Sequence, residues 1–326
     1  MGRRIGDLSL EDLKIYQPGL SSKPDDFDEF WKKQLESIGN IRPAVDIRFR
    51  GYPVPSVEVA DIEFVSWDGT ILKGILVKPK NMDKCPVILS FHGYTGSCGM
   101  PIDFLKWTSM GIAVYSFDVR GQGASPDFAR YSNGTRTPGW MLQGILNPDS
   151  YYYTNVYKDI WMQFNWITSG EAPVKHTKIA LAGSSQGGGL VLSLAGLVDG
   201  IDAVISDYPF LTHFERALKI APAGPYLEIV NYFKVSDPQY KTYETVLRTL
   251  GYIDCVHFCG NIHVPVLMQI GLEDDVTPPS TVFAAYNHLS SEVKTIEVYP
   301  QYSHETNPFH EENKLAFIKK YLIDPQ

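Results

Sequence analysis

Short apolar segments dominate the chain after its first quarter, and most are followed by a loop and then by a segment with helical spacing. Several are rich in β-branched residues, and they lie at residues 86–91, 113–117, 178–182, 203–206, 265–270 and 295–299. Near-continuous apolar strands separated by helices are typical of a parallel sheet that is covered on both faces. The pattern therefore predicts an α/β fold with a mostly parallel central sheet flanked by helices.

The N-terminal part follows two other patterns. Apolar residues recur with helical spacing over 24–38, which predicts a helix packed on the main body. Residues 57–66 and 71–78 alternate apolar and polar positions, and Asp68-Gly69 between them is a hairpin turn signal. We expect these two strands to form an antiparallel edge of the sheet.

Two long intervals interrupt the alternation of strands and helices. Residues 126–157 are rich in glycine and aromatic residues, and residues 211–261 have a mostly helical pattern. Loops of this length in a compact domain are usually functional or interfacial. We expect the first interval to be a rim or interface element and the second a helical cap within one domain spanning 1–326. The alternative is decoration without a role.

Composition narrows the class of protein. The 326 residues carry a net charge of −8 with 44% hydrophobic residues, which is ordinary for a soluble globular protein and argues against a nucleic-acid partner. Arg3-Arg4 is followed by Asp7 rather than by an apolar region, so we expect no export signal. No apolar run reaches the length of a membrane span, and four cysteines are too few for a disulfide scaffold. We expect a cytoplasmic protein that does not contact a membrane.

The candidate nucleophile is Ser185. It is the central residue of Gly183-Ser184-Ser185-Gln186-Gly187, between a predicted strand and a helix expected to begin near Leu190. A serine on a strained strand-to-helix turn needs glycine neighbours, because other side chains would clash with the backbone. Ser184 would need glycine at positions 182 and 186, where Ala182 and Gln186 stand. A glycine turn without chemistry is the alternative, but the flanking strand and helix favour a nucleophile.

The acid and the base follow the nucleophile in this arrangement, in that order. Glu273, Asp274 and Asp275 come after the strand 265–270, and only one of them can face the base. His304 alone follows both these carboxylates and a strand. The other histidines precede the acid or lie in expected helices: His92, His176, His213, His257, His263, His288 and His310.

An oxyanion-binding loop follows the strand 86–91. Phe91-His92-Gly93-Tyr94 matches the His-Gly loop that supplies one backbone N–H, and the residue after the nucleophile supplies the other. We assign these donors to Tyr94 and Gln186. The assembled elements predict an α/β-hydrolase fold with antiparallel N-terminal edge strands and a helical cap.

A metal site is the competing chemistry. Cys255, His257, Cys259 and His263 are close in sequence and are all zinc ligand types. We expect residues 252–259 to be helical, which would turn His257 away from the two cysteines, and the paired spacings of structural zinc are absent. We therefore predict no metal and no cofactor.

These motifs together resemble a known family. Arg120-Gly121-Gln122, Gly183 to Gly187, His304-Glu305, Phe91 to Tyr94 and the stretch 271–287 look like the signatures of the acetyl xylan esterase and cephalosporin C deacetylase family, carbohydrate esterase family seven. The resemblance covers essentially the full chain. It implies Asp274 as the acid, and it makes Glu273 a departure, since an apolar or aromatic residue is more familiar there. Arg120 and Gln122 are expected to fix loops.

The same resemblance implies a substrate class and an assembly. Its members remove acetyl groups from xylo-oligosaccharides and cephalosporin C, and those similar to this chain are intracellular homohexamers whose active sites face an internal cavity. Tyr94, Tyr208 and Phe210 surround the predicted site and would leave a small acyl pocket, unless they merely fill the core.

Two other functions stay open at this point. One is a broader short-chain carboxylesterase, and the other is a non-catalytic binding protein on the same fold. A binding protein of this kind would usually lack one triad member, and none is missing. A peptidase of the prolyl oligopeptidase type typically has Tyr after the nucleophile, where this chain has Gln186.

Overall fold

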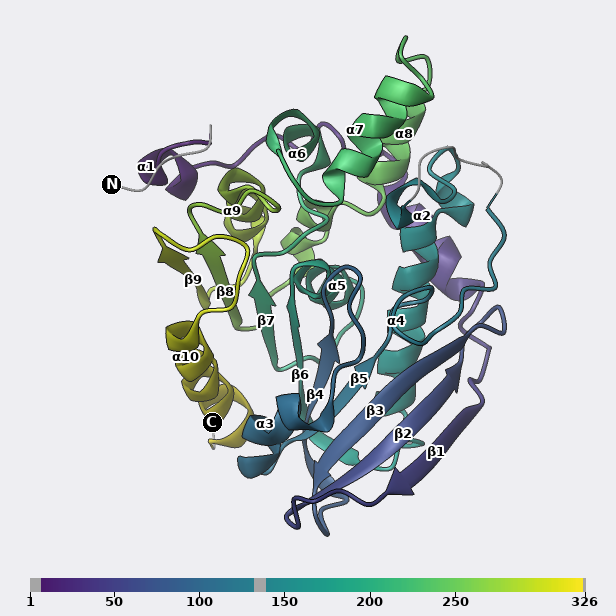
Figure 1. Ribbon diagram of the computed structural model, residues 1–326, viewed down its shortest axis with the longest axis vertical. Helices are drawn as coiled ribbons and strands as arrows, with labels where there is room; N and C mark the ends of the chain where they lie inside the picture. The colour runs from purple at the N-terminus through teal and green to yellow at the C-terminus, as the bar shows by residue number, and fades with distance from the viewer. Residues whose placement is uncertain (1–6, 132–138, 325–326) are drawn as a thin grey trace.

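A single nine-stranded sheet forms the centre of the molecule (Figure 1). The computed structural model describes residues 7–131 and 139–324. The strand order is β1-β2-β3-β5-β4-β6-β7-β8-β9. The strands are β1 (Val45–Arg50), β2 (Val57–Val65), β3 (Ile71–Pro79), β4 (Lys84–Phe91), β5 (Ala113–Phe117), β6 (Lys175–Ser184), β7 (Ala203–Asp207), β8 (Val266–Gly271) and β9 (Lys294–Tyr299).

The two kinds of strand pairing divide the sheet. From β5 through β4 to β9 every pairing is parallel, as the near-continuous apolar segments predicted. β1 pairs with β2 and β2 pairs with β3, both antiparallel. β3 is also antiparallel to β5, which connects the two parts of the sheet. The hairpin at Asp68-Gly69 lies where it was expected. β1 was not predicted, although Val45, Ile47 and Phe49 alternate with charged residues, and it forms the edge of the sheet.

Helices cover both faces of the sheet. One apolar core contains side chains of α2, α4, α5 and α9, and a second contains side chains of α3 and α10 on the opposite face. The mostly parallel sheet flanked by helices is therefore confirmed. The helices are α1 (Leu10–Lys14), α2 (Phe27–Glu36), α3 (Leu105–Ser109), α4 (Tyr152–Thr168), α5 (Gln186–Ala195), α6 (Phe214–Ile220), α7 (Tyr226–Val235), α8 (Tyr243–Gly251), α9 (Pro279–His288) and α10 (Pro308–Ile318).

The interval 126–157 contains two different parts. Residues 152–157 form the start of α4, and Tyr151, Tyr152 and Tyr153 are fully buried. These tyrosines are therefore core residues of this chain rather than part of a rim. Residues 132–138 lie outside the described residues, as do Arg3 and Arg4 near the N-terminus. The interface role of this interval stays a prediction.

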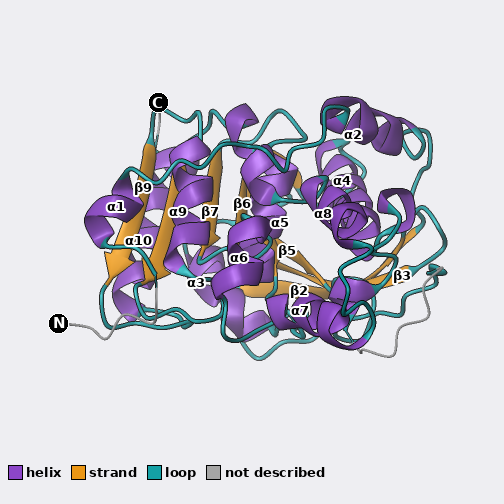
Figure 2. Ribbon diagram, turned by 90° about the horizontal axis from the view of Figure 1, so that it is seen from above, coloured by secondary structure: helices purple, strands orange, loops and turns teal. Residues whose placement is uncertain are grey.

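The interval 211–261 contains α6, α7 and α8, which lie together at the top of Figure 1. Seen from above, the strands run across the molecule from β9 at one side to β3 at the other, with α6 and α7 over them (Figure 2). The expectation of a helix over 252–259 is wrong. α8 ends at Gly251, and the Asp254 carboxylate accepts the N–H of Val256 and caps a short turn at Cys255–His257. Among the helices of the described chain, none is long and apolar enough to cross a membrane.

Candidate active site

Ser185 stands on the sharp turn between β6 and α5. Its backbone has φ 55° and ψ −118°, a conformation that is costly for a residue with a side chain. A Cβ on Gly183 would overlap the backbone of Gly187, and a Cβ on Gly187 would overlap the Phe91 carbonyl oxygen. Gly183 is therefore required by the turn itself, and Gly187 is required by its close approach to the end of β4. α5 begins directly at Gln186, four residues before the expected start at Leu190.

The three residues predicted as nucleophile, base and acid come together in one hydrogen-bonded chain. His304 Nε2 lies 2.9 Å from Ser185 Oγ, and His304 Nδ1 lies 2.8 Å from Asp274 Oδ2. They come from three loops that follow the carboxyl ends of the parallel strands β6, β8 and β9. The Asp274 side chain is fully buried, whereas that of His304 is 20% exposed and reaches a pocket.

Local backbone geometry selects Asp274 among the three consecutive carboxylates. Its Oδ1 accepts the N–H groups of Val276 and Thr277, and its Oδ2 accepts the Thr277 hydroxyl at 2.9 Å. These bonds fix the carboxylate so that Oδ2 faces His304. Glu273 and Asp275 are only half-buried. Thr277 was not predicted to have a role, and its signal was its position three residues after the acid, where a side chain can return to a loop carboxylate.

The two predicted oxyanion donors are the backbone N–H groups of Tyr94 and Gln186. Among the hydrogen bonds between described residues, none uses the backbone N–H of Tyr94 or of Gln186. Gln186 is the first residue of α5, so its N–H has no partner within the helix. Tyr94 lies on the loop after β4 and lines the same pocket as Ser185, and the oxyanion role of the two N–H groups stays a prediction.

Side chains of the Arg-Gly-Gln motif and His92 hold this loop. The Gln122 amide oxygen accepts the N–H of Thr95 at 2.9 Å, and its amide nitrogen donates to the Gln186 side-chain oxygen at 2.9 Å. His92 Nε2 accepts the N–H of Val119, and burial lowers the pKa of His92, which favours the neutral ring. Arg120 is fully buried and forms ion pairs with Asp68 and Asp159. These contacts agree with the loop-fixing roles expected for Arg120 and Gln122.

A pocket of about 420 Å³ opens beside Ser185 and His304. Tyr94 and Tyr208 line it, together with Pro225 of the cap interval and Val276 of the acid loop. The Tyr208 ring meets His304 edge-on at 4.7 Å, and burial raises the pKa of Tyr208 to about 12. The residues that line the pocket include no carboxylate, lysine or arginine, and two of them are tyrosines.

Phe210 requires a correction, because it is not part of this pocket lining. Its side chain is fully buried and packs edge-on against Tyr94 at 6.1 Å and against Tyr226 at 4.6 Å. It therefore supports the wall from behind. The sequence predicted a substrate-binding ring at this position, but the backbone after β7 directs the side chain into the core.

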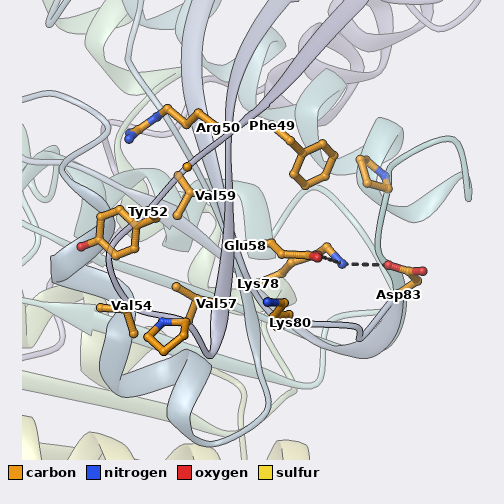
Figure 3. Close-up of a pocket in the computed structure, with 13 residues that line it drawn as sticks. Phe49, Arg50, Tyr52, Val54, Val57, Glu58, Val59, Lys78, Lys80 and Asp83 are labelled. Atoms are coloured by element: carbon orange, nitrogen blue, oxygen red, sulfur yellow. Dashed lines mark hydrogen bonds and ion pairs between the residues drawn. The ribbon is translucent and has the colours of Figure 1, made fainter.

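A larger cavity, of about 670 Å³, lies at the antiparallel edge of the sheet (Figure 3). Phe49 and Tyr52 stand on opposite sides of it, and Lys78 is paired with Glu58 at 2.6 Å and with Asp83 at 2.8 Å. Its lining residues include no serine, cysteine or histidine. Size alone therefore does not identify the site of chemistry.

The candidate zinc ligands are dispersed among other contacts. Cys255 Sγ lies 3.2 Å from the Gly189 carbonyl oxygen, His257 Nδ1 lies 2.8 Å from the Gly251 carbonyl oxygen, and His263 is exposed. Within residues 7–131 and 139–324, no group of three such side chains is arranged to hold a metal ion.

A second aspartate–histidine pair lies beneath the turn of Ser185. His310 Nε2 is 2.8 Å from Asp207 Oδ1, and His310 Nδ1 is 2.6 Å from Glu297 Oε2. Lys314 also pairs with Asp207, whose second oxygen accepts the Ser184 hydroxyl at 3.2 Å. The backbone carbonyl of Asp207 accepts the N–H of Ser185 at 2.9 Å. The sequence placed His310 correctly in a helix but did not predict this buried ion cluster.

Comparison with known proteins identifies the family of this chain. The sequence profile of the acetyl xylan esterase family (AXE1) matches residues 3–321. The acetyl esterase Axe7A of Xylanibacter ruminicola is 24% identical over 97% of this chain and 70% of its own length. Among solved structures, the acetyl xylan esterase from Paenibacillus sp. R4 is 41% identical with a TM-score of 0.92, covering 97% of this chain and 100% of that one.

A second solved structure of an acetyl xylan esterase is similar over nearly the whole chain. Acetyl xylan esterase 1 from Thermoanaerobacterium sp. JW/SL YS485 is 33% identical with a TM-score of 0.90, covering 98% of this chain and 100% of that one. The α/β-hydrolase fold therefore extends over nearly the whole molecule. The chain belongs to the acetyl xylan esterase family and is a carboxylic ester hydrolase.

Proposed function

We propose that this protein is a serine esterase that removes acetyl groups from acetylated xylo-oligosaccharides, with Ser185, His304 and Asp274 as its catalytic triad. The observation that carries the proposal is the continuous hydrogen-bonded chain from Ser185 Oγ through His304 to Asp274 at the wall of a pocket. Membership of the acetyl xylan esterase family supports the choice of the acetyl group.

The first half of the reaction forms an acetyl-enzyme. Ser185 Oγ attacks the acetyl carbonyl carbon while His304 Nε2 takes the hydroxyl proton. Collapse of the tetrahedral intermediate breaks the bond to the sugar oxygen, which receives that proton from His304. Asp274 accepts a hydrogen bond from Nδ1–H throughout, which keeps Nε2 free to act as the base and stabilises the charged ring.

The negative charge on the carbonyl oxygen is met by the N–H groups of Tyr94 and Gln186. Such donors act on charge that develops only in the transition state, and each contributes about 10²–10³ in rate. The dipole of α5, which begins at Gln186, favours the same charge.

The second half uses the same groups again, with water in place of Ser185 as the attacking nucleophile. A water molecule gives a proton to His304 and attacks the acetyl carbon, and the bond to Ser185 Oγ breaks. Oγ recovers a proton from His304, and acetate leaves. Every role in this cycle is held by a protein group, so the proposal includes no metal and no cofactor.

The pocket walls support a preference for short acyl groups. Tyr94 and Tyr208 stand beside the reacting atoms, and Phe210 behind Tyr94 restricts outward movement of that ring. Added methylenes would meet these rings, whereas the alcohol part would extend toward the cap. The alcohol side would then accept both a sugar and the cephem of cephalosporin C.

The family resemblance also supports cephalosporin C as a second substrate and a cytoplasmic homohexamer whose active sites face an internal cavity. Light scattering on the purified protein tests the assembly, and release of acetate from cephalosporin C tests the second substrate. Neither result bears on the roles of Ser185 and His304.

The acyl preference is tested by comparing kcat/KM for p-nitrophenyl acetate, butyrate and octanoate at one pH. We expect kcat/KM for the acetate to exceed that for octanoate by about 10–200-fold or more. This is the factor that a single methylene can contribute in a pocket that fits its substrate closely. A profile that rises toward octanoate would instead favour the broader carboxylesterase. Binding of acetylated xylo-oligosaccharide without release of acetate would favour the non-catalytic binding protein.

A further inference from the structure

A carboxylate of the cap is hydrogen-bonded to the loop that carries one of the proposed oxyanion donors. Glu228 lies in the first turn of α7, and its Oε1 accepts the Tyr94 hydroxyl at 2.7 Å. The other oxygen of Glu228 accepts the N–H of Met141 at 3.0 Å, and the Tyr94 hydroxyl accepts the N–H of Trp140 at 3.1 Å. Three segments distant in sequence therefore meet at one side chain.

The placement of Glu228 is unlike that of a surface carboxylate. It is half-buried, and burial raises its pKa; burial and the adjacent carboxylate also raise the pKa of Tyr94. Within the described residues Glu228 forms no ion pair with Lys, Arg or His, and the donors to its carboxylate there are the Tyr94 hydroxyl and the Met141 N–H. A Cβ on Gly139 would overlap the carboxylate, so the chain approaches Glu228 closely where a residue without a side chain stands. Burial of a carboxylate costs free energy, which its hydrogen-bond donors must offset.

What Glu228 positions is a residue with two roles at the proposed site. The backbone N–H of Tyr94 is a proposed oxyanion donor, and its ring lines the acyl pocket. The ring lies edge-on against Trp140 at 5.2 Å and against Phe210 at 6.1 Å. Packing thus restrains the faces of the ring, whereas the bond to Glu228 restrains its outer end.

We infer that Glu228 is a positioning residue that holds Tyr94, and thereby the oxyanion N–H and the acyl-pocket wall, in the reactive arrangement. It acts from the cap, so one side chain links α7 to the loop that carries the proposed oxyanion donor. The inference rests on the proposed function, because it assigns a role within the same reaction.

The test uses Glu228→Gln, which preserves the size of the side chain and an acceptor for Met141 but removes the charged acceptor of the Tyr94 hydroxyl. Glu244→Gln is the matched control, because Glu244 is an exposed carboxylate on the neighbouring cap helix α8. We expect Glu228→Gln to lower kcat for p-nitrophenyl acetate by about 10–100-fold, since small displacements of aligned groups have effects of this order. KM should change little, and the preference for acetate over butyrate should decrease. Glu244→Gln should retain the parental kcat and the parental acyl preference.

A double-mutant cycle identifies the route of the effect. Tyr94→Phe removes the hydroxyl that Glu228 holds, so the double variant should lose no more kcat than the more affected single variant. An effect of Glu228 that multiplies with that of Tyr94→Phe would overturn the inference, and so would an unchanged kcat in a folded Glu228→Gln protein. If Glu228→Gln does not fold, Tyr94→Phe alone decides, because it breaks the same bond from the other end. A parental kcat in Tyr94→Phe would then refute the inference.

The proposed function is checked in the same assay. Parental hydrolysis of p-nitrophenyl acetate that is lost in Ser185→Ala establishes the serine esterase before any Glu228 variant is compared. A parent without this activity would refute the proposed function, whereas an active parent with an unaffected Glu228→Gln variant would refute only the role of Glu228.

Discussion

Two aspartate–histidine pairs lie near the carboxyl ends of the parallel strands, each with 2.8 Å between a ring nitrogen and a carboxylate oxygen. Their surroundings differ. In the first, Asp274 holds His304, whose other ring nitrogen faces the hydroxyl of Ser185. In the second, Asp207 holds His310, whose other ring nitrogen faces the Glu297 carboxylate. The His304 side chain is 20% exposed and that of His310 is fully buried. An imidazole beside a hydroxyl and a pocket can move a proton, whereas one between the buried Asp207 carboxylate and the half-buried Glu297 carboxylate serves as a fixed cation.

The electrostatics of the second pair follow from this enclosure. Burial opposes the charged ring, but the hydrogen bonds to Asp207 and Glu297 outweigh burial and raise the pKa of His310. Burial likewise opposes the Asp207 carboxylate, but Lys314 and His310 outweigh it and lower the pKa of Asp207. The comparison teaches that distance within such a pair does not identify catalysis. The partner of the second ring nitrogen does.

The largest expected effect on activity comes from the two adjacent serines. Ser185 contacts His304 of the first pair, whereas Ser184 contacts Asp207 of the second. Ser185→Ala removes the attacking oxygen and should lower kcat by about 10⁶ without unfolding the protein. Ser184→Ala removes a hydrogen bond to Asp207 and an interaction with the Tyr208 hydroxyl, and it should retain most of the activity. Ester hydrolysis and circular dichroism of both variants check this. Activity kept in Ser185→Ala but lost in Ser184→Ala would reverse the assignment of the pairs.

The acid of the first pair should show the next largest effect. Asp274→Asn should lower kcat by about 10⁴, because the amide no longer holds the histidine in the tautomer that accepts a proton. Asp275→Asn and Glu273→Gln are matched controls on half-buried neighbours and should cost far less. Single-turnover rates measure all three. An equally severe loss in Asp275→Asn would show that the acid of the pair is the neighbouring carboxylate.

The second pair should affect stability rather than turnover. His310→Gln leaves Asp207 and Glu297 without their shared cation and should lower the free energy of unfolding by about 3–5 kcal/mol, as loss of one partner in a buried ion pair does. kcat of the protein that remains folded should change little. Loss of turnover without loss of stability would place His310 in the reaction and remove the distinction between the pairs.

The pH dependence of this difference has a defined sign. Because the folded protein raises the pKa of His310, its contribution is complete below the unfolded value, about 6.5, and is lost as the pH rises through the folded value. Asp207 has a lowered pKa, so its contribution is complete above about 3.8 and is lost as the pH falls. The stability gap between parent and His310→Gln should therefore be larger near about pH 5.5 than near about pH 9 in urea unfolding. A gap that widens at the higher pH would contradict a charged His310.

Metal removal should have the smallest effect, because both pairs are completed by protein groups. Prolonged chelation should leave ester hydrolysis and the unfolding midpoint unchanged within error. Activity that disappears on chelation and returns with zinc would direct attention to Cys255, His257, Cys259 and His263.

The sequence determined the features that depend on a few consecutive residues. The spacing of Gly183 and Gly187 identifies Ser185; a Cβ on Gly183 would overlap the backbone of Gly187 within the same turn, which is a local constraint, whereas Gly187 is also required by its close approach to Phe91 of β4. The apolar strands predicted the parallel sheet for a similar reason, since burial on both faces requires apolar residues at successive positions. The chain order of nucleophile, acid and base then left His304 as the base. The choice of Asp274 among its neighbours came from the family resemblance, and the hydrogen bonds of its loop supply a physical reason.

The tertiary structure alone decided which distant side chains meet. Tyr94 and Glu228 are 134 positions apart, and Asp207 and His310 are 103 apart, so no local pattern connects them. Phe210 was expected in the pocket with Tyr208, but the backbone after β7 turns it into the core. A helix was expected over 252–259, but a short turn at Cys255–His257 stands there. The Asp254 carboxylate before it accepts the N–H groups of His213 and Phe214, a contact that the local sequence does not indicate. Local sterics can be read along the chain, whereas these contacts exist only after the cap and the sheet have packed together.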